Sequence, residues 1–149
     1  MKGYFKVPLT FNHCFDVDKY SLHINCGGKQ TTIRKIKYES DEDSGGPAMF
    51  VHSQPTWGFS STGDFSGIWS STKDYIANNV SVLRMNDSEL YTTARLSPLS
   101  LTYYARCLAN GNYTVKLHFS EIVFRDNRSY YSVGRRIFDV YIQVDLDIL

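Results

Sequence analysis

Apolar and polar residues alternate along several stretches of this chain with the two-residue period of β-strands. Residues 113–120 alternate throughout, as a strand with one buried and one solvated face does. The same rhythm occurs in residues 20–26, 99–107 and 138–142. No convincing helical stripe of apolar residues is present. The pattern predicts an all-β protein whose antiparallel strands pack as a β-sandwich or jelly roll.

Turn-forming residues separate these stretches. Asn110–Gly111 stands between two alternating runs and predicts a β-hairpin. Between residues 39 and 86 the alternation weakens, while glycine, proline and aromatic residues accumulate. Because aromatic residues argue against disorder, we predict that residues 39–86 form an ordered loop region at one end of the sandwich.

Length and charge restrict the class of protein. The 149 residues suit one domain with its own hydrophobic core. The 16 basic and 15 acidic residues are scattered, so there is no basic face for nucleic acid. No apolar run approaches the length of about 20 residues that spans a bilayer. The N-terminus lacks the apolar core of a signal peptide, so we expect neither a convincing signal peptide nor a membrane span in this chain.

Cysteines and glycosylation sequons indicate an exported protein. Asn-X-Ser/Thr sequons occur at Asn79, Asn86, Asn112 and Asn127. Cys26 and Cys107 are in phase with the apolar residues of their predicted strands, so we predict a Cys26–Cys107 disulfide across the core. Cys14 is then unpaired or bonded outside this segment, and a Cys14–Cys26 disulfide is the alternative. Chance sequons and three reduced thiols are the competing interpretation.

Candidate catalytic and metal-binding groups do not form a recognisable motif. Glu121 and Asp139 lie next to core-facing strand positions, where a carboxylate is more often structural. The acidic residues 41–45 lack the remaining ligands of a calcium loop. The histidines have no metal-ligand spacing, and no helix follows Gly27–Gly28 to make an anion site. We therefore expect no enzyme activity in this chain, no cofactor and no metal.

Aromatic residues suggest recognition of carbohydrate. They make up 15% of the chain. A tyrosine or tryptophan ring covers the C–H face of a sugar, while polar groups bond its hydroxyls. The residues that the pattern places on loops or at polar strand positions are Tyr38, Trp57, Phe59, Trp69 and Tyr104.

Several segments resemble the malectin domain found in the ectodomains of plant leucine-rich-repeat receptor-like serine/threonine kinases. The segments are SLHINCGG at 21–28, YESD at 38–41 with SGG at 44–46, WGFSSTGDF at 57–65, ELYTTAR at 89–95, GNYTV at 111–115, LHFSEI at 117–122 and GRRIFDVYIQ at 134–143. The resemblance implies a linker over residues 1–19 and a malectin domain over residues 20–149. The family pattern continues past Gln143, so the resemblance also implies a C-terminally truncated domain.

The resemblance implies a function as well as a fold. It implies a jelly-roll sandwich similar to carbohydrate-binding modules, on the extracellular side of the plasma membrane, as part of a larger receptor with a separate kinase domain. Tyr91 and Tyr103 match aromatic binding positions of the animal relative, whereas Leu96 and Leu101 stand where that relative has aromatics. The implied function is non-catalytic binding of an oligosaccharide or cell-wall glycan. The alternative is a module that recognises peptides or other receptor ectodomains, or a spacer.

Overall fold

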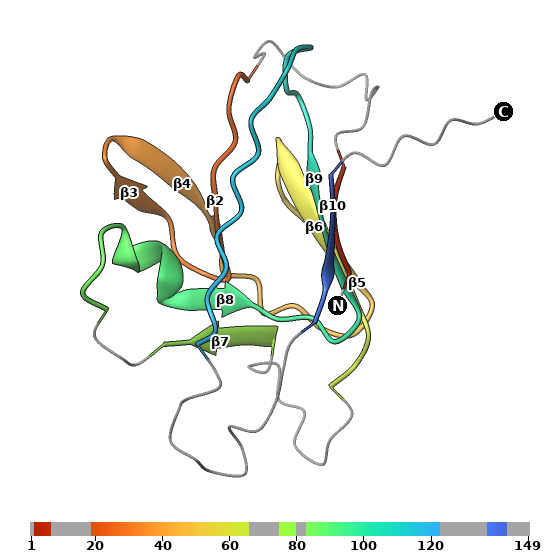
Figure 1. Ribbon diagram of the computed structural model, residues 1–149. Helices are drawn as coiled ribbons and strands as arrows, with labels where there is room; N and C mark the ends of the chain where they lie inside the picture. The colour runs from red at the N-terminus through yellow and green to blue at the C-terminus, as the bar shows by residue number, and fades with distance from the viewer. Residues whose placement is uncertain (1, 7–18, 66–74, 80–82, 123–136, 143–149) are drawn as a thin grey trace, which may run out of the picture.

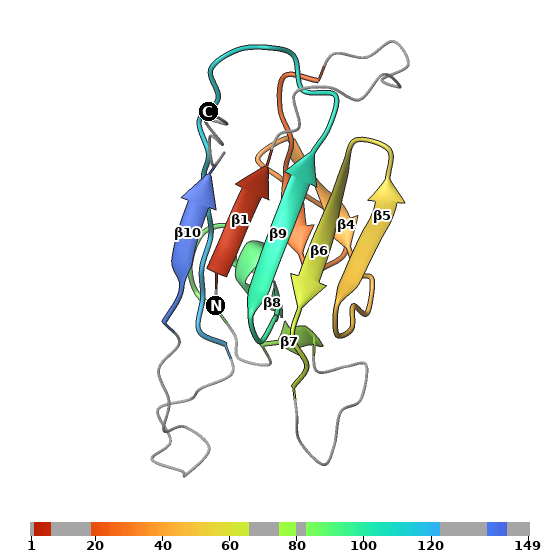
Figure 2. The same cartoon turned by 90° about the vertical axis from the view of Figure 1, so that its right-hand side faces the viewer.

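The regular secondary structure of the described chain consists almost entirely of β-strands, arranged in two layers (Figures 1 and 2). The computed structural model describes residues 2–6, 19–65, 75–79, 83–122 and 137–142. Its elements are β1 (Lys2–Lys6), β2 (Ile24–Cys26), β3 (Thr31–Ile33), β4 (Ile36–Asp41), β5 (Met49–Gln54), β6 (Trp57–Thr62), β7 (Ile76–Asn78), the short 3-10 helix η2 (Ser88–Tyr91), β8 (Thr93–Arg95), β9 (Ser100–Ala105) and β10 (Asp139–Ile142).

One layer is a five-stranded sheet in the order β10-β1-β9-β6-β5, seen face-on in Figure 2. The other layer contains the three-stranded sheet β2-β4-β3, and β7 pairs with β8 below it in Figure 1. The pairs β5–β6, β6–β9, β3–β4 and β7–β8 are antiparallel. The prediction of an all-β sandwich is confirmed. Parallel pairing of β1 with β9 and β10, and of β2 with β4, adds a feature that alternation alone does not reveal.

The hydrophobic core lies between the layers and is centred on β6. Trp57 and Phe59 are fully buried and form the core with Val51 of β5. Leu22, Ile24, Met49, Leu101 and Tyr103 pack against it. Since side chains alternate along a strand, the odd-numbered residues of β6 face the core, while Ser60 and Thr62 lie on the outer face. The prediction that residues 39–86 are a loop region is therefore wrong, because β5 and β6 lie within it.

Residues 2–6, which precede the predicted malectin domain, form β1 and pair with β9 and β10 in the large sheet. The prediction of a hairpin at Asn110–Gly111 is wrong, since the described residues 111–122 contain no strand and are mostly exposed. Alternation shows that a segment is able to form a strand, but a strand also needs a neighbour that takes its hydrogen bonds.

The predicted Cys26–Cys107 disulfide is also wrong. Cys107 is disulfide-bonded, whereas Cys26 has a free thiol. Cys107 lies two residues beyond β9 and has a left-handed φ of 56°. This conformation ends the alternation, so the phase of the strand does not extend to the Cys107 side chain. Cys14 lies outside the described residues.

No helix in the described part of the chain is long and apolar enough to cross a lipid bilayer.

Candidate functional site

Two of the predicted sugar-binding aromatics are core residues. Trp57 and Phe59 have 0% of their surface exposed. The Trp57 indole Nε1 donates a hydrogen bond of 2.7 Å to Glu39, which also pairs with Lys19 at 3.0 Å. A ring without exposed surface cannot stack on a sugar, so the assignment of these two residues to a binding site is wrong. Trp69 lies outside the described residues.

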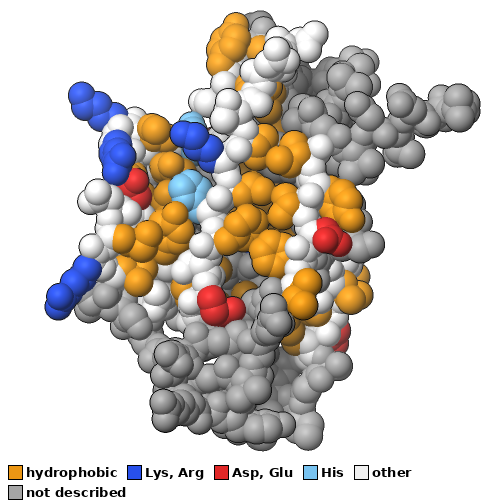
Figure 3. All heavy atoms as spheres, in the orientation of Figure 1, with side chains coloured by type: hydrophobic (Ala, Val, Ile, Leu, Met, Phe, Trp, Pro, Cys, Tyr) orange, Lys and Arg blue, Asp and Glu red, His pale blue; other side chains and the backbone are white. Residues whose placement is uncertain are grey.

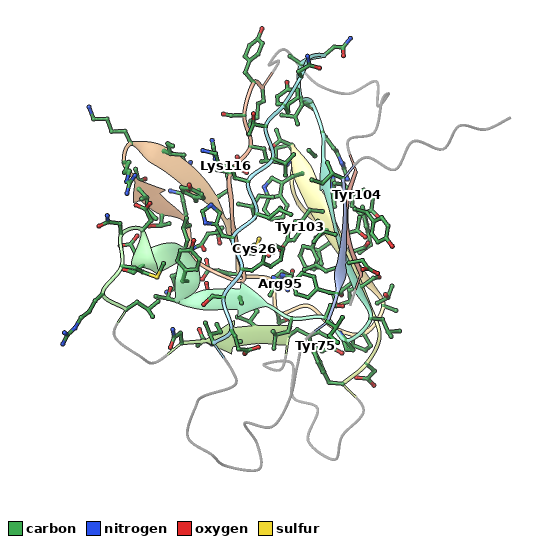
Figure 4. The ribbon with its side chains drawn as sticks, viewed as in Figure 1. Cys26, Tyr75, Arg95, Tyr103, Tyr104 and Lys116 are labelled. Carbon is green, nitrogen blue, oxygen red and sulfur yellow. The ribbon has the colours of Figure 1, made fainter. Side chains whose placement is uncertain are left out.

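Tyr103 belongs to a buried polar network centred on Asp41. Its hydroxyl donates to the Asp41 carboxylate at 2.7 Å. Arg95 donates to the same carboxylate from Nε at 2.7 Å and from a terminal nitrogen at 2.8 Å. Its guanidinium also lies 4.1 Å from the centre of the Phe59 ring. Figure 4 shows Arg95 and Tyr103 together between the layers, so the network connects β4, β8 and β9 through the core.

Burial and pairing act on the pKa values of this network in opposite directions. Desolvation raises the pKa of Asp41, against the lowering effect of Arg95, Tyr103 and the Gly27 N–H. Burial alone would lower the pKa of Arg95, but Asp41 reverses this and raises it. The raised pKa of Arg95 favours the ionised form of the pair, whereas the raised pKa of Asp41 opposes it. Since donors from three residues converge on the carboxylate, we take the pair to be ionised at neutral pH.

Cys26 adds a thiol to the same network (Figure 4). Desolvation raises its pKa from 9.0 to about 11, although a hydrogen bond with Tyr103 lowers it in part. Desolvation likewise raises the pKa of Tyr103 well above its ordinary value. Because the folded-state pKa of Cys26 exceeds the unfolded value, its contribution to stability is fully present below about pH 9 and is lost as the pH rises through about 11.

We expect Cys26 to be alkylated about tenfold more slowly at pH 8 in the folded protein than in urea. A pKa higher by two units reduces the thiolate about a hundredfold, and the greater nucleophilicity of a more basic thiolate offsets about a factor of ten. The residue surface is exposed while the thiol itself is desolvated, so any hindrance to the reagent would only add to this difference. Timed iodoacetamide labelling with mass spectrometry measures both rates. Equal rates in the two states would contradict the raised pKa.

Tyr38 and Tyr91 lie on a partly exposed surface around η2. We call the residues Thr31, Tyr38, Glu89, Tyr91 and His118 the η2 surface. The Tyr91 hydroxyl and His118 Nδ1 are 2.8 Å apart, and the two rings meet edge-on at 5.7 Å. Thr31 of β3 donates a hydrogen bond to the Glu89 carboxylate and pairs with Tyr38 across the β3–β4 ladder. Tyr38 also packs on His23, with ring centres 5.3 Å apart. The surface therefore combines two aromatic rings with a carboxylate and an imidazole.

The side chains of the η2 surface remain in contact with solvent. Thr31, Tyr38 and Tyr91 are half-buried, and Glu89 and His118 are exposed. His118 lies in the extended segment 111–122, which passes in front of β2 in Figure 1. Figure 3 shows apolar side chains gathered on this side of the molecule, with a histidine and basic residues beside them. Such a mixture suits an uncharged ligand that has both C–H and hydroxyl surfaces.

Tyr104 occupies a third position, on the outer face of the large sheet. It meets Phe50 of β5 edge-on at 5.8 Å, and its hydroxyl is 3.1 Å from that of Ser60. Phe50 is 60% exposed. Figure 4 shows Tyr104 on the side of β9 away from Tyr103. The six predicted aromatics in the described part of the chain are thus divided among the core (Trp57, Phe59, Tyr103), the η2 surface (Tyr38, Tyr91) and the outer face (Tyr104).

Sequence reasoning missed the polar members of the η2 surface. Glu89 lies beside Tyr91 in η2, and His118 is 27 residues from Tyr91. His118 could be placed only at a polar position of an alternating run. Its contact with Tyr91 depends on the path of residues 111–122 past η2, which no local pattern encodes. In the part of the chain that the structure describes, no group of three or more His, Cys, Asp or Glu side chains could hold a metal ion.

Comparison with known proteins identifies relatives of this chain. The family model of the malectin domain matches residues 20–148. Three probable LRR receptor-like serine/threonine-protein kinases of Arabidopsis thaliana are 47%, 48% and 43% identical over 135, 126 and 156 residues. These alignments cover 87%, 82% and 99% of this chain. No solved structure matches significantly.

The relatives are much longer than the matched region. This chain spans 13%, 12% and 15% of the length of these three kinases. The kinase activity in these names is a property of the relatives. The match therefore shows the family to which this chain is related. It does not show the activity of a longer protein.

Proposed function

This chain belongs to the malectin domain family, and from that premise we propose that it is a non-catalytic recognition module of a receptor ectodomain, which binds an oligosaccharide or cell-wall glycan at the η2 surface. Its place is then the extracellular side of the plasma membrane. The disulfide at Cys107 supports an oxidising compartment. The resemblance to receptor-like kinases supports the receptor context.

The observation that carries the proposal is the pairing of Tyr91 with His118, with Glu89 two residues before Tyr91 in η2. The hydrogen bond to His118 fixes the Tyr91 ring, so little rotamer freedom is lost when a ligand binds. The bond from Thr31 similarly holds the Glu89 carboxylate. A sugar ring placed on Tyr91 would present its C–H face to the aromatic ring and its hydroxyls to Glu89 and His118. Binding of a neutral sugar requires no catalytic group.

We expect Tyr91→Ala to weaken glycan binding about tenfold, equivalent to about 1.4 kcal/mol, because it removes the fixed ring. Tyr91→Phe keeps the ring and loses only the bond to His118, so its effect should be smaller. A glycan array with glucan and pectin oligosaccharides identifies ligands, and calorimetric titration at millimolar concentrations measures affinity. Tyr104→Ala, on the outer face, is the matched control and should leave the affinity unchanged.

Two results would count against this proposal. The first is the absence of binding to any glucan or pectin oligosaccharide by a folded protein. The second is an equal loss of affinity in Tyr91→Ala and Tyr104→Ala, which would show that the η2 surface is not the site.

Recognition of a peptide or another receptor ectodomain is the alternative function. The exposed Phe50 ring, packed edge-on against Tyr104, favours it, because exposed aromatics are common at the centres of protein interfaces. Leu101, which stands where the animal relative has an aromatic, packs against the core and cannot replace that ring. If this alternative holds, Phe50→Ala should abolish capture of a co-expressed receptor ectodomain, and Tyr91→Ala should not.

A further inference from the structure

We propose that the exported chain carries N-linked oligosaccharides on Asn86 and Asn112 but not on Asn79. The inference depends on entry into the secretory pathway, which the extracellular placement implies, and not on sugar binding at the η2 surface. All three residues have the same Asn-X-Ser/Thr pattern, so the sequence alone does not distinguish them. The transferase acts on the chain before it folds, and the folded domain then determines which glycans a secreted molecule can carry. The surroundings of the three residues differ in this respect.

Asn86 lies on an exposed loop that enters η2. Its residue surface is exposed, and Asp87 after it has a left-handed φ of 60° at the start of the helix. The Asp87 carboxylate pairs with Arg34 at 3.1 Å. This pair and the helix hold the loop from one side. A glycan on Asn86 would therefore extend into solvent without displacing a packed group.

Asn112 lies at the start of the exposed segment 111–122. The neighbouring Gly111 has open space around it, since an added Cβ atom would meet no atom within 4 Å. Tyr113 holds the segment in place by donating a hydrogen bond of 2.6 Å to the Ala109 carbonyl. Thr114, the third residue of the sequon, is exposed as well. The whole sequon is thus accessible, and its surroundings leave room for a branched oligosaccharide.

Asn79 has a different environment at the end of β7. Its backbone N–H donates to the Thr92 carbonyl at 2.7 Å and so continues the β7–β8 ladder. The residue is half-buried. A glycan here would have to leave from a paired, partly covered position, and the folded domain would lose packing to accommodate it.

The modification is a transfer of a preformed oligosaccharide from a polyprenyl diphosphate donor. The asparagine Nδ2 forms a bond to C1 of the first sugar, and the bond from C1 to the diphosphate oxygen breaks. The amide loses one proton and the diphosphate leaves with its electron pair, so no oxidant or reductant is required. The transferase of the secretory pathway supplies the donor, and this chain supplies only the acceptor amide.

This placement leaves one face of the domain without glycans. None of the described strands of the large sheet contains a sequon. Phe50 and Tyr104 on its outer face would therefore remain uncovered, whereas Asn86 precedes η2 and Asn112 begins the segment that carries His118. A glycan at Asn86 would lie next to η2, and glycans at both positions would leave the outer face open.

The test is site-resolved glycopeptide mapping of the full chain, expressed behind a secretory signal peptide in plant cells. The chain carries Asn127→Gln, because that sequon lies outside the described residues. Mapping is done on protein from the medium and on protein retained in the endoplasmic reticulum. We expect most molecules to carry glycan at Asn86 and at Asn112 and to have an unmodified Asn79. Asn86→Gln and Asn112→Gln should each remove one step of gel mobility that the glycosidase PNGase A, which accepts plant N-glycans, also removes, and Asn79→Gln should remove none.

Glycan on Asn79 in most molecules of the secreted protein would overturn the proposal, as would unmodified Asn86 or Asn112 there. If Asn86 and Asn112 are glycosylated as expected but no glycan binds to the η2 surface, only the proposed function is overturned. The two failures are therefore distinguishable.

Discussion

Arg95→Met is expected to lower the free energy of unfolding by about 3–5 kcal/mol, because it leaves the Asp41 carboxylate charged, buried and without its main partner. The side chains of both residues are 1% exposed. Arg95 donates two hydrogen bonds to the carboxylate and others to the backbone carbonyls of Asp41 and Asp43. Methionine retains most of the aliphatic volume but none of these donors. Urea unfolding monitored by tryptophan fluorescence measures the change.

A second Arg–Asp pair in the same domain provides the control. The Arg34–Asp87 pair has a similar distance, 3.1 Å, but its side chains are 67% and 31% exposed. Arg34→Met should therefore change the unfolding free energy by only about 0–1 kcal/mol. The double variant Asp41→Leu with Arg95→Met should be more stable than Arg95→Met alone, because it removes the unpaired charge. Equal effects of the two arginine substitutions would show that the Asp41–Arg95 pair is not desolvated.

Local alternation predicts a strand correctly where another strand lies beside the segment in the folded domain. Residues 99–107 contain β9, and 138–142 contain β10. Alternation failed for residues 113–120, whose apolar side chains at Leu117 and Phe119 are 44% and 59% exposed. The alternation of a segment shows which side chains it could bury on one face. The position of neighbouring segments decides whether that face is buried.

Strand β6, which supplies Trp57 and Phe59 to the core, was not predicted because of its composition. Trp57, Phe59 and Ser61 alternate with Gly58, Ser60 and Thr62, but glycine and serine weaken the contrast between the two faces. Gly58 is needed where it is, because a Cβ atom there would lie 2.7 Å from the Val51 carbonyl oxygen of the adjacent strand. Residues that fit a close backbone contact therefore resembled a loop sequence. The assignment of Trp57 and Phe59 to a sugar site followed from that error.

Long-range contacts account for the rest of what the sequence did not reveal. Asp41 and Arg95 are 54 residues apart and Asp41 and Tyr103 are 62 apart, so no spacing rule connects them. Tyr103 could be recognised as an aromatic of interest through the family resemblance. Its hydroxyl nevertheless bonds a buried carboxylate in this fold. The same residue type at the η2 surface, Tyr91, remains available to a ligand because its partner His118 is itself exposed.

Trp57→Ala is expected to lower the free energy of unfolding by about 3–5 kcal/mol, the usual cost of removing a large aromatic side chain from a core. Trp57 has no exposed surface and packs with Phe59 and Val51. The substitution also removes the indole donor of the bond to Glu39, although Lys19 still pairs with that carboxylate. Trp57→Phe keeps most of the ring volume and loses the donor, so it should cost less than Trp57→Ala. Chemical denaturation followed by far-ultraviolet circular dichroism measures these variants without depending on the tryptophan signal.

Phe50→Ala is the matched control, since Phe50 lies on the adjacent strand but on the outer face, 60% exposed. It should change stability by no more than about 0.5 kcal/mol if its ring contributes little beyond the contact with Tyr104. If Phe50→Ala proved as destabilising as Trp57→Ala, the outer face would have to be covered in solution. The large sheet would then be an interior layer of a larger assembly, and Tyr104 could not serve as the control for glycan binding. A large loss confined to Trp57→Ala leaves the outer face open, which the comparison of Tyr91 with Tyr104 requires.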